Sequence, residues 1–271
     1  MEENPKKPLI SIIIPTKDSG ATLERCLRSI SEQSFRDFEL IIVDCHSTDG
    51  TAETAKRFGA ALIESKAGLP AARNLGFSVS KGRIILSIDS DMILEPSVLA
   101  EVAGSMAGYG ALIIPEVGYG NDFFSKCKDL EKRCYIDDHR IESARAISRE
   151  AYRKTGGYDP DLFFGEDHDM HSRLKAGFKI GRISSRIMHD TSAVPPLKQI
   201  SKAYNYGKTI HNLRAKKNPR GDFALNPANS IFIRHFGKLA REPVHAAGLL
   251  VFKSMEYCFG LAGFFSAKTR P

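Results

Sequence analysis

Tryptophan is absent from this chain of 271 residues, and its five cysteines are scattered. The cysteines stand at positions 26, 45, 127, 134 and 258, and no two of them form a C-x-x-C pair. An odd, scattered set of this kind is typical of free thiols in a reducing cytosol rather than of disulfides or a zinc site. Residues 1–7 also lack the apolar stretch of a signal peptide, so we expect a cytoplasmic protein.

Long uninterrupted hydrophobic runs are missing too. Residues 246–252 and 257–265 are apolar, but Lys253 and Glu256 stand between them. Each run is shorter than the ~18–20 residues of a spanning helix, and a helix through both would carry two charges at its centre, where charge is costly. Aromatic and aliphatic residues beside many Lys and Arg instead predict a helical element at a membrane surface. A cap on the rest of the chain and a dimer contact are the alternatives.

Acidic residues are rare near the end of the chain. Residues 191–271 contain 13 Lys and Arg against 3 Asp and Glu, whereas residues 1–190 contain 26 against 29. We therefore predict two domains, residues 1–190 and a basic helical extension over residues 191–271. A basic extension favours a polyanionic partner such as anionic lipid or a phosphorylated substrate. Nucleic acid is not expected, because the aromatic residues there cluster with aliphatic ones instead of alternating with Arg. The most basic stretch, residues 198–220, has no acid and carries Lys198, Lys202, Lys208, Arg214, Lys216, Lys217 and Arg220.

Strand and helix patterns alternate through the first third of the chain. Apolar strands are expected at residues 9–14, 38–43, 60–63 and 83–88, and amphipathic helices at residues 20–33, 51–58 and 69–79. This alternation predicts an α/β fold, a Rossmann-like, mainly parallel sheet flanked by helices. Ligands of such sheets bind outside the carboxyl ends of the strands. The pattern is looser afterwards, with helices expected at residues 96–106, 123–136 and 167–176 and strands at 111–115, 144–147 and 179–187.

Two carboxylates stand one residue apart directly after the buried strand at residues 83–88. They belong to Asp89-Ser90-Asp91. Mg²⁺ and Mn²⁺ take oxygen ligands and often share them with the phosphates of a substrate. The motif therefore predicts a metal-bridged diphosphate at the edge of the sheet, although the same pattern also occurs in surface turns.

Five further motifs follow one another along the chain. They are Ser11-Ile12-Ile13-Ile14-Pro15-Thr16-Lys17-Asp18, Ile41-Ile42-Val43-Asp44 with Ser47-Thr48-Asp49-Gly50-Thr51, Ala72-Arg73-Asn74-Leu75-Gly76, Gly156-Gly157-Tyr158-Asp159 with Gly165-Glu166-Asp167-His168-Asp169, and His189. With Asp89-Ser90-Asp91 among them, residues 10–189 resemble the family 2 inverting glycosyltransferases of the GT-A fold. The resemblance implies metal-dependent transfer of a sugar from a nucleotide-diphosphate sugar to an acceptor hydroxyl, with inversion.

The resemblance also implies which residues meet the donor. Asp44 would accept a hydrogen bond from the base, with a loop-capping role as the alternative, and Asp18 stands where the family often has Asn or Glu. UDP fits best by analogy, and GDP and dTDP remain open. The full set expected to bind the nucleotide sugar is Pro15, Thr16, Asp18, Asp44, Arg73, Asn74, Asp89 and Ser90.

The metal, Mn²⁺ or Mg²⁺, would be bound by three residues that belong to two of these motifs. By resemblance Asp91 is the direct ligand, Asp89 faces the ribose or the metal, and His189 completes the site. Neutral imidazole suits Mn²⁺ better than Mg²⁺.

The resemblance implies that Glu166 and Asp167 carry out the transfer chemistry. Asp167 would take the proton of the attacking hydroxyl, and Glu166 would orient the acceptor. Acids in a first helical turn are also stabilised by the helix dipole, which is the structural alternative. A zinc pair of His168 and His171 is not expected, because no further His or Cys lies nearby in the sequence.

Two other functions are the alternatives. A sugar nucleotidylyltransferase would need a Gly-rich amino-terminal loop with Arg and Lys, which residues 17–20 do not supply. A non-catalytic relative that binds nucleotide sugars or lipids on the same fold is the other alternative. The acceptor is not marked by any motif; if the basic extension meets a membrane, the acceptor could be lipid-linked and the protein peripheral on the cytoplasmic membrane face.

Overall fold

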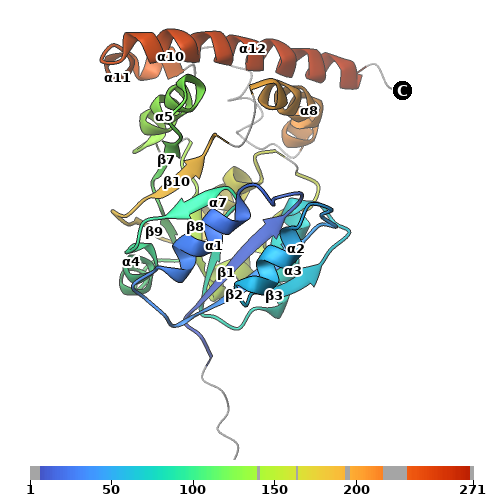
Figure 1. Cartoon of the computed structure of the whole chain (residues 1–271), viewed down its shortest axis with the longest axis vertical. Helices are drawn as coiled ribbons and strands as arrows, with labels where there is room; N and C mark the ends of the chain where they lie inside the picture. Colours follow the sequence, from blue (N-terminus) through green and yellow to red (C-terminus); the bar gives the residue numbers. More distant parts are fainter. Residues whose placement is uncertain (1–6, 139–140, 163, 193–195, 216–230, 269–271) are drawn as a thin grey trace, which may run out of the picture. The chain divides into compact units, whose positions relative to one another are not determined.

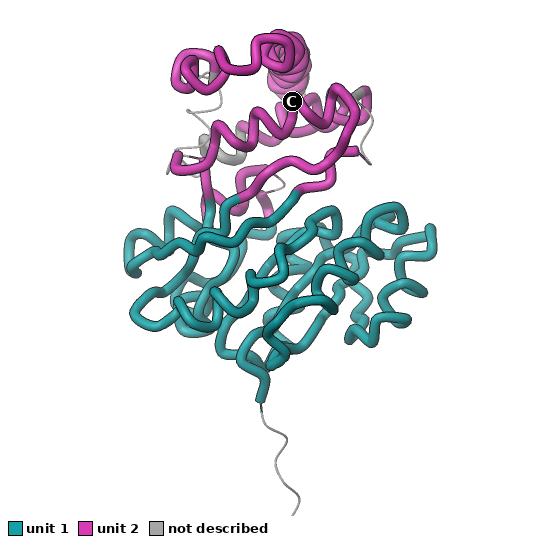
Figure 2. The backbone as a smooth tube through the Cα atoms, turned by 60° about the vertical axis from the view of Figure 1, so that its left-hand side comes forward, with its two compact units in different colours: residues 1–115, 143–160, 170–188 teal, residues 116–142, 161–169, 189–271 magenta. Residues whose placement is uncertain are grey.

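The computed structural model describes residues 7–138, 141–162, 164–192, 196–215 and 231–268. The chain forms two compact units (Figure 2). Unit 1 contains residues 1–115, 143–160 and 170–188, and unit 2 contains residues 116–142, 161–169 and 189–271. Of the basic stretch at residues 198–220, Lys216, Lys217 and Arg220 lie outside the described residues, as does the side chain of Arg214.

A seven-stranded sheet carries the order β3-β2-β1-β4-β8-β6-β9 (Figure 1). The pairs β1–β2, β1–β4, β2–β3 and β6–β9 are parallel, and β8 runs antiparallel to β4 and β6. The predicted mainly parallel sheet is therefore confirmed. The strands are β1 (Ile10–Thr16), β2 (Phe38–Asp44), β3 (Ala61–Glu64), β4 (Ile84–Ser87), β6 (Ala111–Ile113), β8 (Ala144–Ser148) and β9 (Ile180–Arg182).

Helices cover both faces of this sheet, because successive side chains of a strand point to opposite faces. Ile12 and Ile14 pack in one buried cluster with Leu23 and Leu27 of α1, whereas Ile13 packs in a second cluster that includes helix residues of α3, α6 and α7. The helices of this part of the chain are α1 (Leu23–Ser31), α2 (Thr51–Arg57), α3 (Leu69–Val79), α4 (Val98–Ser105), α5 (Phe123–Tyr135), α6 (Arg149–Thr155) and α7 (Glu166–Gly177).

A second sheet has three strands in the order β5-β10-β7, namely β5 (Met92–Leu94), β10 (Ile187–Asp190) and β7 (Glu116–Tyr119). The single strand expected at residues 179–187 is wrong, because β9 and β10 are separate strands in different sheets. Between them the backbone N–H groups of Ser184 and Ser185 donate to the carboxylate of Glu101 at 2.7 and 3.2 Å. These amides are satisfied by a side chain instead of a neighbouring strand, so the strand is interrupted.

The described residues between 196 and 268 are largely helical, as predicted for the extension. The helices are α8 (Pro196–Ala215), α10 (Ile231–Arg234), α11 (Phe236–Leu239) and α12 (Pro243–Lys268). The two apolar runs and the charged residues between them form one helix of 26 residues. By length and composition, Pro243–Ala267 is the one helix in the described residues that could cross a membrane, and its most apolar window is 17% buried.

Helices α8 and α12 cross with their backbones in contact. A Cβ atom on Gly207 would collide with the carbonyl oxygen of Gly260, and one on Gly263 would collide with that of Tyr204. In the first half of α12, Phe252 meets Phe124 of α5 edge to face, with ring centroids 4.6 Å apart. Helix α12 is therefore packed within unit 2 at two places along its length, against α5 and against α8.

Candidate active site

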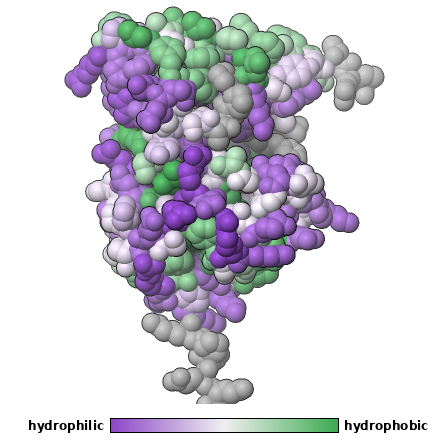
Figure 3. Space-filling view, in the orientation of Figure 1, coloured by the Kyte–Doolittle hydropathy of each residue, from purple (hydrophilic) through white to green (hydrophobic). Residues whose placement is uncertain are grey.

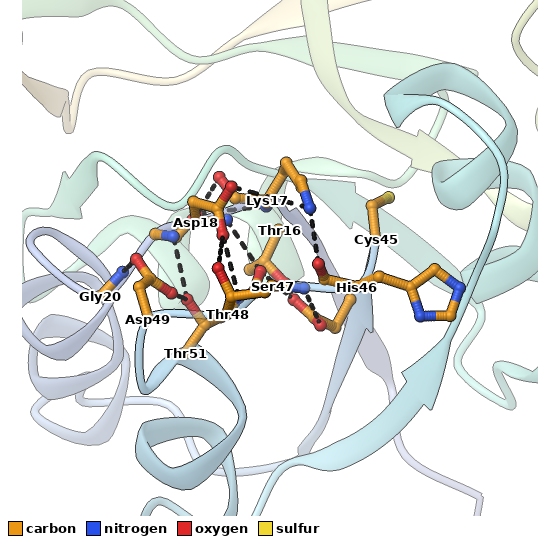
Figure 4. Close-up of polar contacts among 12 residues, drawn as sticks. Thr16, Lys17, Asp18, Gly20, Cys45, His46, Ser47, Thr48, Asp49 and Thr51 are labelled. Atoms are coloured by element: carbon orange, nitrogen blue, oxygen red, sulfur yellow. Dashed lines mark hydrogen bonds and ion pairs between the residues drawn. The ribbon is translucent and has the colours of Figure 1, made fainter.

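The loops that follow β1 and β2 are joined by a network of hydrogen bonds (Figure 4), and Asp44 accepts several of them. Thr16 and Asp44 are register partners at the ends of their strands, and Thr16 Oγ1 donates to Asp44 Oδ1 at 2.7 Å. Ser47 donates to the same carboxylate from its backbone N–H at 2.9 Å and its hydroxyl at 2.6 Å. Burial disfavours the ionised form, but these hydrogen bonds and the charge of Lys17 outweigh it, so the pKa of Asp44 is lowered. Asp44 thus caps its loop; a contact with the base stays a prediction.

Asp18 ties the first loop to the second. Its backbone has a positive φ of 45°, its N–H donates to Ser47 Oγ at 2.8 Å, and its Oδ1 accepts from the N–H of Thr48 at 3.0 Å. Beside it, Lys17 Nζ donates to the carbonyl oxygen of His46 at 2.5 Å. The two loops therefore form one cross-linked polar surface at the carboxyl ends of β1 and β2, where ligands of α/β sheets bind.

The strand expected at residues 9–14 extends to Thr16, so Pro15 and Thr16 lie inside β1. Pairing with β4 stops at Ile13, whereas pairing with β2 continues to Thr16. Beyond Ile13 the side of β1 towards β4 is an edge, where a proline without an N–H is tolerated. The turn begins at Lys17.

Asp89 is clamped by two buried cations. Its Oδ1 lies 2.6 Å from Nη2 of Arg73, and its Oδ2 lies 3.5 Å from Nη1 of Arg145. The side chains of Arg73 and Arg145 are only 3% and 10% exposed. The guanidinium of Arg73 also stacks over the ring of Tyr158, 5.2 Å from its centroid. The acid that resemblance assigned to the ribose or metal is thus held in place by positive charge.

Arg145 was missed by the sequence reasoning. It stands in β8, between Ala144 and Ala146, and both neighbours are buried. An arginine is almost never fully buried unless it is paired. A cation in the middle of an apolar strand was the signal that a partner carboxylate lies beside it.

Asn74 uses its side chain to hold the turn at residues 156–159. Its Nδ2 donates to the carbonyl oxygen of Tyr158 at 2.7 Å, and its Oδ1 accepts from the N–H of Tyr158 and the hydroxyl of Tyr152, both at 2.9 Å. Gly157, at a φ of 76°, closes this turn against the Asn74 amide. A contact of Asn74 with the donor stays a prediction.

Ser90 joins the Asp89-Ser90-Asp91 loop to the loop after β1, because its hydroxyl donates to Ser19 Oγ at 2.8 Å. Among the described residues, no group of three or more His, Cys, Asp or Glu side chains is arranged to hold a metal ion. A Mg²⁺-type ion needs only one or two carboxylates when substrate phosphates supply further oxygens. The carboxylate of Asp91 fits that requirement, whereas both oxygens of Asp89 already face guanidinium groups.

Glu166 and Asp167 form the first turn of α7 and belong to unit 2, whereas α7 from Met170 onward belongs to unit 1. Both acids are half-buried. The loop before them contains Gly165, at a φ of 77°, and Phe164, whose ring stacks on Tyr206 of α8 with centroids 4.8 Å apart. The pair is therefore presented at the start of a helix whose dipole favours the ionised carboxylates.

His189 lies in β10 and also belongs to unit 2. Its Nδ1 lies 3.6 Å from Oε2 of Glu116, which accepts from Lys132 Nζ at 2.8 Å. His171, by contrast, is buried and its Nδ1 accepts from the N–H of Ala144 at 3.1 Å. Burial, with a smaller effect of Lys175, lowers the pKa of His171 to about 4, so it is a neutral structural acceptor at neutral pH.

Comparison with known proteins gives the class of this site. The family model described as Glycosyl transferase family 2 matches residues 11–162. A curated relative, Glycosyltransferase GlyG of Streptococcus pneumoniae, is 34% identical over 98 residues, which are 34% of this chain and 33% of that protein. The matched segment thus spans about a third of the length of the curated relatives.

Solved structures share the fold over almost the whole chain. The mannosyltransferase PcManGT from Pyrobaculum calidifontis, in complex with GDP-Man and Mn²⁺, gives a TM-score of 0.63 at 19% identity and covers 98% of this chain and 88% of that one. S. aureus TarS 1–349 in complex with UDP-GlcNAc gives a TM-score of 0.56 at 17% identity, over 96% of this chain and 91% of that one. The arrangement of sheet and helices is therefore that of the GT-A fold.

Proposed function

This chain belongs to glycosyl transferase family 2, and from that premise we propose that it moves a sugar from a nucleotide-diphosphate sugar to an acceptor hydroxyl with inversion. The observation that carries the proposal is the placement of the cross-linked loops around Asp44 and of the clamped Asp89 after neighbouring parallel strands. Such an edge supplies both a polar surface for a nucleotide and charges for a diphosphate.

The donor is proposed to bind in unit 1. Asp18, Thr16 and Asp44 would position the base, and Arg73, with Asn74 beside it, would lie near the phosphates. The GDP-Man and UDP-GlcNAc complexes of the two structural neighbours support a nucleotide sugar of this kind. We expect UDP, with GDP and dTDP as the other candidates.

A divalent cation, Mn²⁺ or Mg²⁺, is proposed to bind at Asp91, with Asp89 and His189 as the further candidate ligands. When bound, the ion would offset the charge that grows on the departing diphosphate. The Mn²⁺ named in the PcManGT complex supports this choice. Asp91→Ala should weaken metal-dependent nucleotide binding.

Asp167 is proposed to be the general base and Glu166 to orient the acceptor. As the acceptor oxygen bonds to the anomeric carbon, its proton passes to the Asp167 carboxylate. The bond from that carbon to the diphosphate breaks on the opposite face, and its electron pair leaves with the nucleotide. The half-buried position of Asp167 in the first turn of α7 supports this role.

A lipid-linked acceptor and a peripheral position on the cytoplasmic face of a membrane complete the proposal. They are supported by the basic composition of residues 191–271, the extension that we propose as a domain beside residues 1–190. Nucleic acid is not proposed as a partner.

Binding is tested first, by thermal shift with UDP-, GDP- and dTDP-sugars, each with and without Mn²⁺. A ligand that binds only the folded chain raises its stability by about 2.7 kcal/mol at a hundredfold excess over Kd. A metal-dependent shift with one nucleotide is expected. Its absence from the whole panel would favour the non-catalytic relative.

Transfer is tested with Asp167→Asn. We expect the variant to keep the donor-induced thermal shift and to lose turnover by about 10²–10⁴-fold, the usual contribution of a general base. Asp169→Asn in the same helical turn is the matched control, because it loses the same favourable interaction with the helix dipole. Equal effects of the two substitutions, or normal turnover of Asp167→Asn, would remove Asp167 as the base.

A further inference from the structure

Helix α12 presents an apolar face to solvent. At 3.6 residues per turn, residues 244, 251, 255, 259 and 265 lie within about 60° of one line along the helix. Their side chains, Val244, Val251, Met255, Phe259 and Phe265, are 67%, 58%, 36%, 46% and 59% exposed, and we call them the outer face of α12. Apolar residues gather over this helix in the space-filling view (Figure 3). Soluble surface helices carry polar residues on this side.

The charged residues in the middle of α12 point the other way. Lys253 Nζ lies 2.9 Å from Oε1 of Glu131 on α5, and Glu256 Oε1 lies 2.9 Å from Nζ of Lys128 on the same helix. Lys128 and Glu131 pair with each other at 2.8 Å, and Lys253 and Glu256 at 2.7 Å. Two positive and two negative charges thus neutralise one another inside unit 2, and no charge interrupts the outer face.

The same contacts decide between spanning a membrane and lying on it. A lone spanning helix is surrounded by hydrocarbon, but α12 packs against α5 in its first half and against α8 in its second half. Taking α12 across a bilayer would carry Lys253 and Glu256, with their partners on α5, into the hydrocarbon, where charge is costly. With one side of α12 packed inside unit 2, the apolar side that remains exposed suits a helix in the plane of the interface.

The positive charge around the outer face of α12 indicates which kind of surface covers it. Next to the start of α12, Ile233 of α10 and Phe236 of α11 are further exposed apolar residues, and Arg241 beside them is an exposed cation. Residues 191–271 carry 13 Lys and Arg against 3 Asp and Glu. A second copy of the chain would bring two positive surfaces together, whereas an anionic bilayer attracts basic residues.

We propose that the outer face of α12 lies flat on an anionic lipid bilayer, with Val251, Met255 and Phe259 inserted at the boundary of headgroups and acyl chains. This deepens the membrane contact of the proposed function, on which it rests, by naming the surface, its orientation and the lipid charge. Arg241, whose side chain is exposed, contacts the anionic headgroups.

Flotation with lipid vesicles tests the surface. The full chain should float with phosphatidylcholine–phosphatidylglycerol vesicles and far less with pure phosphatidylcholine. Val251→Asp and Phe259→Asp should each lower the partition coefficient about tenfold, because burial of the side chain is replaced by a charge. The matched control is Val79→Asp, at an exposed valine of α3 in unit 1, which should float like the parent chain. Circular dichroism checks that all variants fold.

Two results would overturn the proposal. One is flotation of Val251→Asp and Phe259→Asp equal to that of Val79→Asp. The other is a dimer of the parent chain in light scattering without lipid that Val251→Asp dissociates, because the outer face would then be a contact between copies.

Orientation is tested by the depth of a fluorophore attached at single cysteines. The single cysteines are introduced as Val244→Cys, Met255→Cys and Phe265→Cys. In each variant Cys45 and exposed Cys258 are replaced by Ser, and Cys26, Cys127 and Cys134 are kept because they are buried and do not react with the label. Nitroxide lipids should quench all three at the same shallow depth; a deeper Met255→Cys label would mean that α12 spans. The donor-induced thermal shift needs no lipid. If the parent chain shows this shift but does not float, only this inference is refuted. If it floats but shows no shift with any donor, only the proposed transfer is refuted.

Discussion

At the scale of single residues, the clamp on Asp89 predicts a measurable loss of stability. Asp89→Asn removes the negative charge between the guanidinium groups of Arg73 and Arg145. Breaking a fully buried pair costs about 3–5 kcal/mol. Because the side chain of Asp89 is 29% exposed, we expect its replacement to lower the free energy of unfolding by about 1–3 kcal/mol, measured by urea denaturation without nucleotide.

The control is Glu150→Gln, which breaks an ion pair with Lys154 that is exposed on both sides. Pairs of this i, i+4 type contribute about 0.3–0.5 kcal/mol. If Asp89→Asn costs no more than Glu150→Gln, the two arginines do not hold the acid, and its position must come from the backbone.

His171 predicts how stability falls in acid. Its pKa is about 4 in the folded chain, lowered by burial, whereas an unfolded histidine titrates near its ordinary value of 6.5. Between these values the unfolded chain binds a proton that the folded chain does not, so the free energy of unfolding decreases as pH falls from 6.5 towards 4. The full contribution is present above pH 6.5. The slope is at most about 1.4 kcal/mol per pH unit.

The measurement is urea denaturation at several pH values in that window. His171→Gln should flatten the dependence, since glutamine does not titrate. His46→Gln, at an exposed side chain in the loop after β2, should leave it unchanged. A parallel decrease for the parent chain and His171→Gln would assign the acid sensitivity to other groups.

The sequence predicted the acids that stand at or directly after strand ends, and Arg73, but it missed Arg145, the second arginine beside Asp89. Asp44 and Asp89 were found because each directly follows a run of apolar residues. Arg145 was missed because its partner is 56 positions away along the chain, and strand pairing between β8 and β4 brings the two near each other. The use of the Asn74 amide by Tyr158 depends on an equally distant contact, 84 positions along the chain.

At the scale of elements, the close crossing of α8 and α12 predicts that a glycine-to-alanine substitution lowers stability there, although the same substitution raises stability in an open helix. Gly207→Ala places a methyl group against the carbonyl of Gly260, whereas Gly104→Ala in α4 meets nothing within 4 Å. Alanine in an open helical position stabilises by up to about 1 kcal/mol, and overpacking costs about 1–3 kcal/mol. We expect a higher melting temperature for Gly104→Ala and a lower one for Gly207→Ala. Stabilisation by both would mean that the helices do not touch.

Elements with a strong local pattern were predicted and elements defined by distant partners were not. The strand at Phe38–Asp44 and the helix at Leu69–Val79 have clear apolar periodicity, and both were found within a residue or two. Strands β5 and β7 have three and four residues, and only pairing with β10 makes them strands. In the sequence, α12 is visible only as two apolar runs separated by Lys253 and Glu256. The partners of these two residues on α5, which allow one continuous helix, cannot be seen in the sequence.

At the scale of the whole molecule, the compact units are not continuous along the chain. Residues 116–142 and 161–169 group with residues 189–271, and α7 and β10 each pass from one unit to the other. The change of charge near residue 190 marks a change in composition, and composition cannot reveal which earlier segments pack with the basic extension. The proposed base, Asp167, therefore shares a unit with the basic helices, although it precedes the basic extension in the sequence.

The uneven charge of the molecule makes a last prediction, about salt. The chain has 39 Lys and Arg against 32 Asp and Glu, and the excess lies in residues 191–271. Raising NaCl from about 0.1 to about 1 M shortens the Debye length from ~10 to ~3 Å, so attraction to anionic headgroups weakens. Burial of the apolar outer face of α12 is not screened. We expect flotation with anionic vesicles to decrease with salt to the level seen with neutral vesicles, without vanishing. Complete release would show that charge alone holds the chain, and no change would show that charge plays no part.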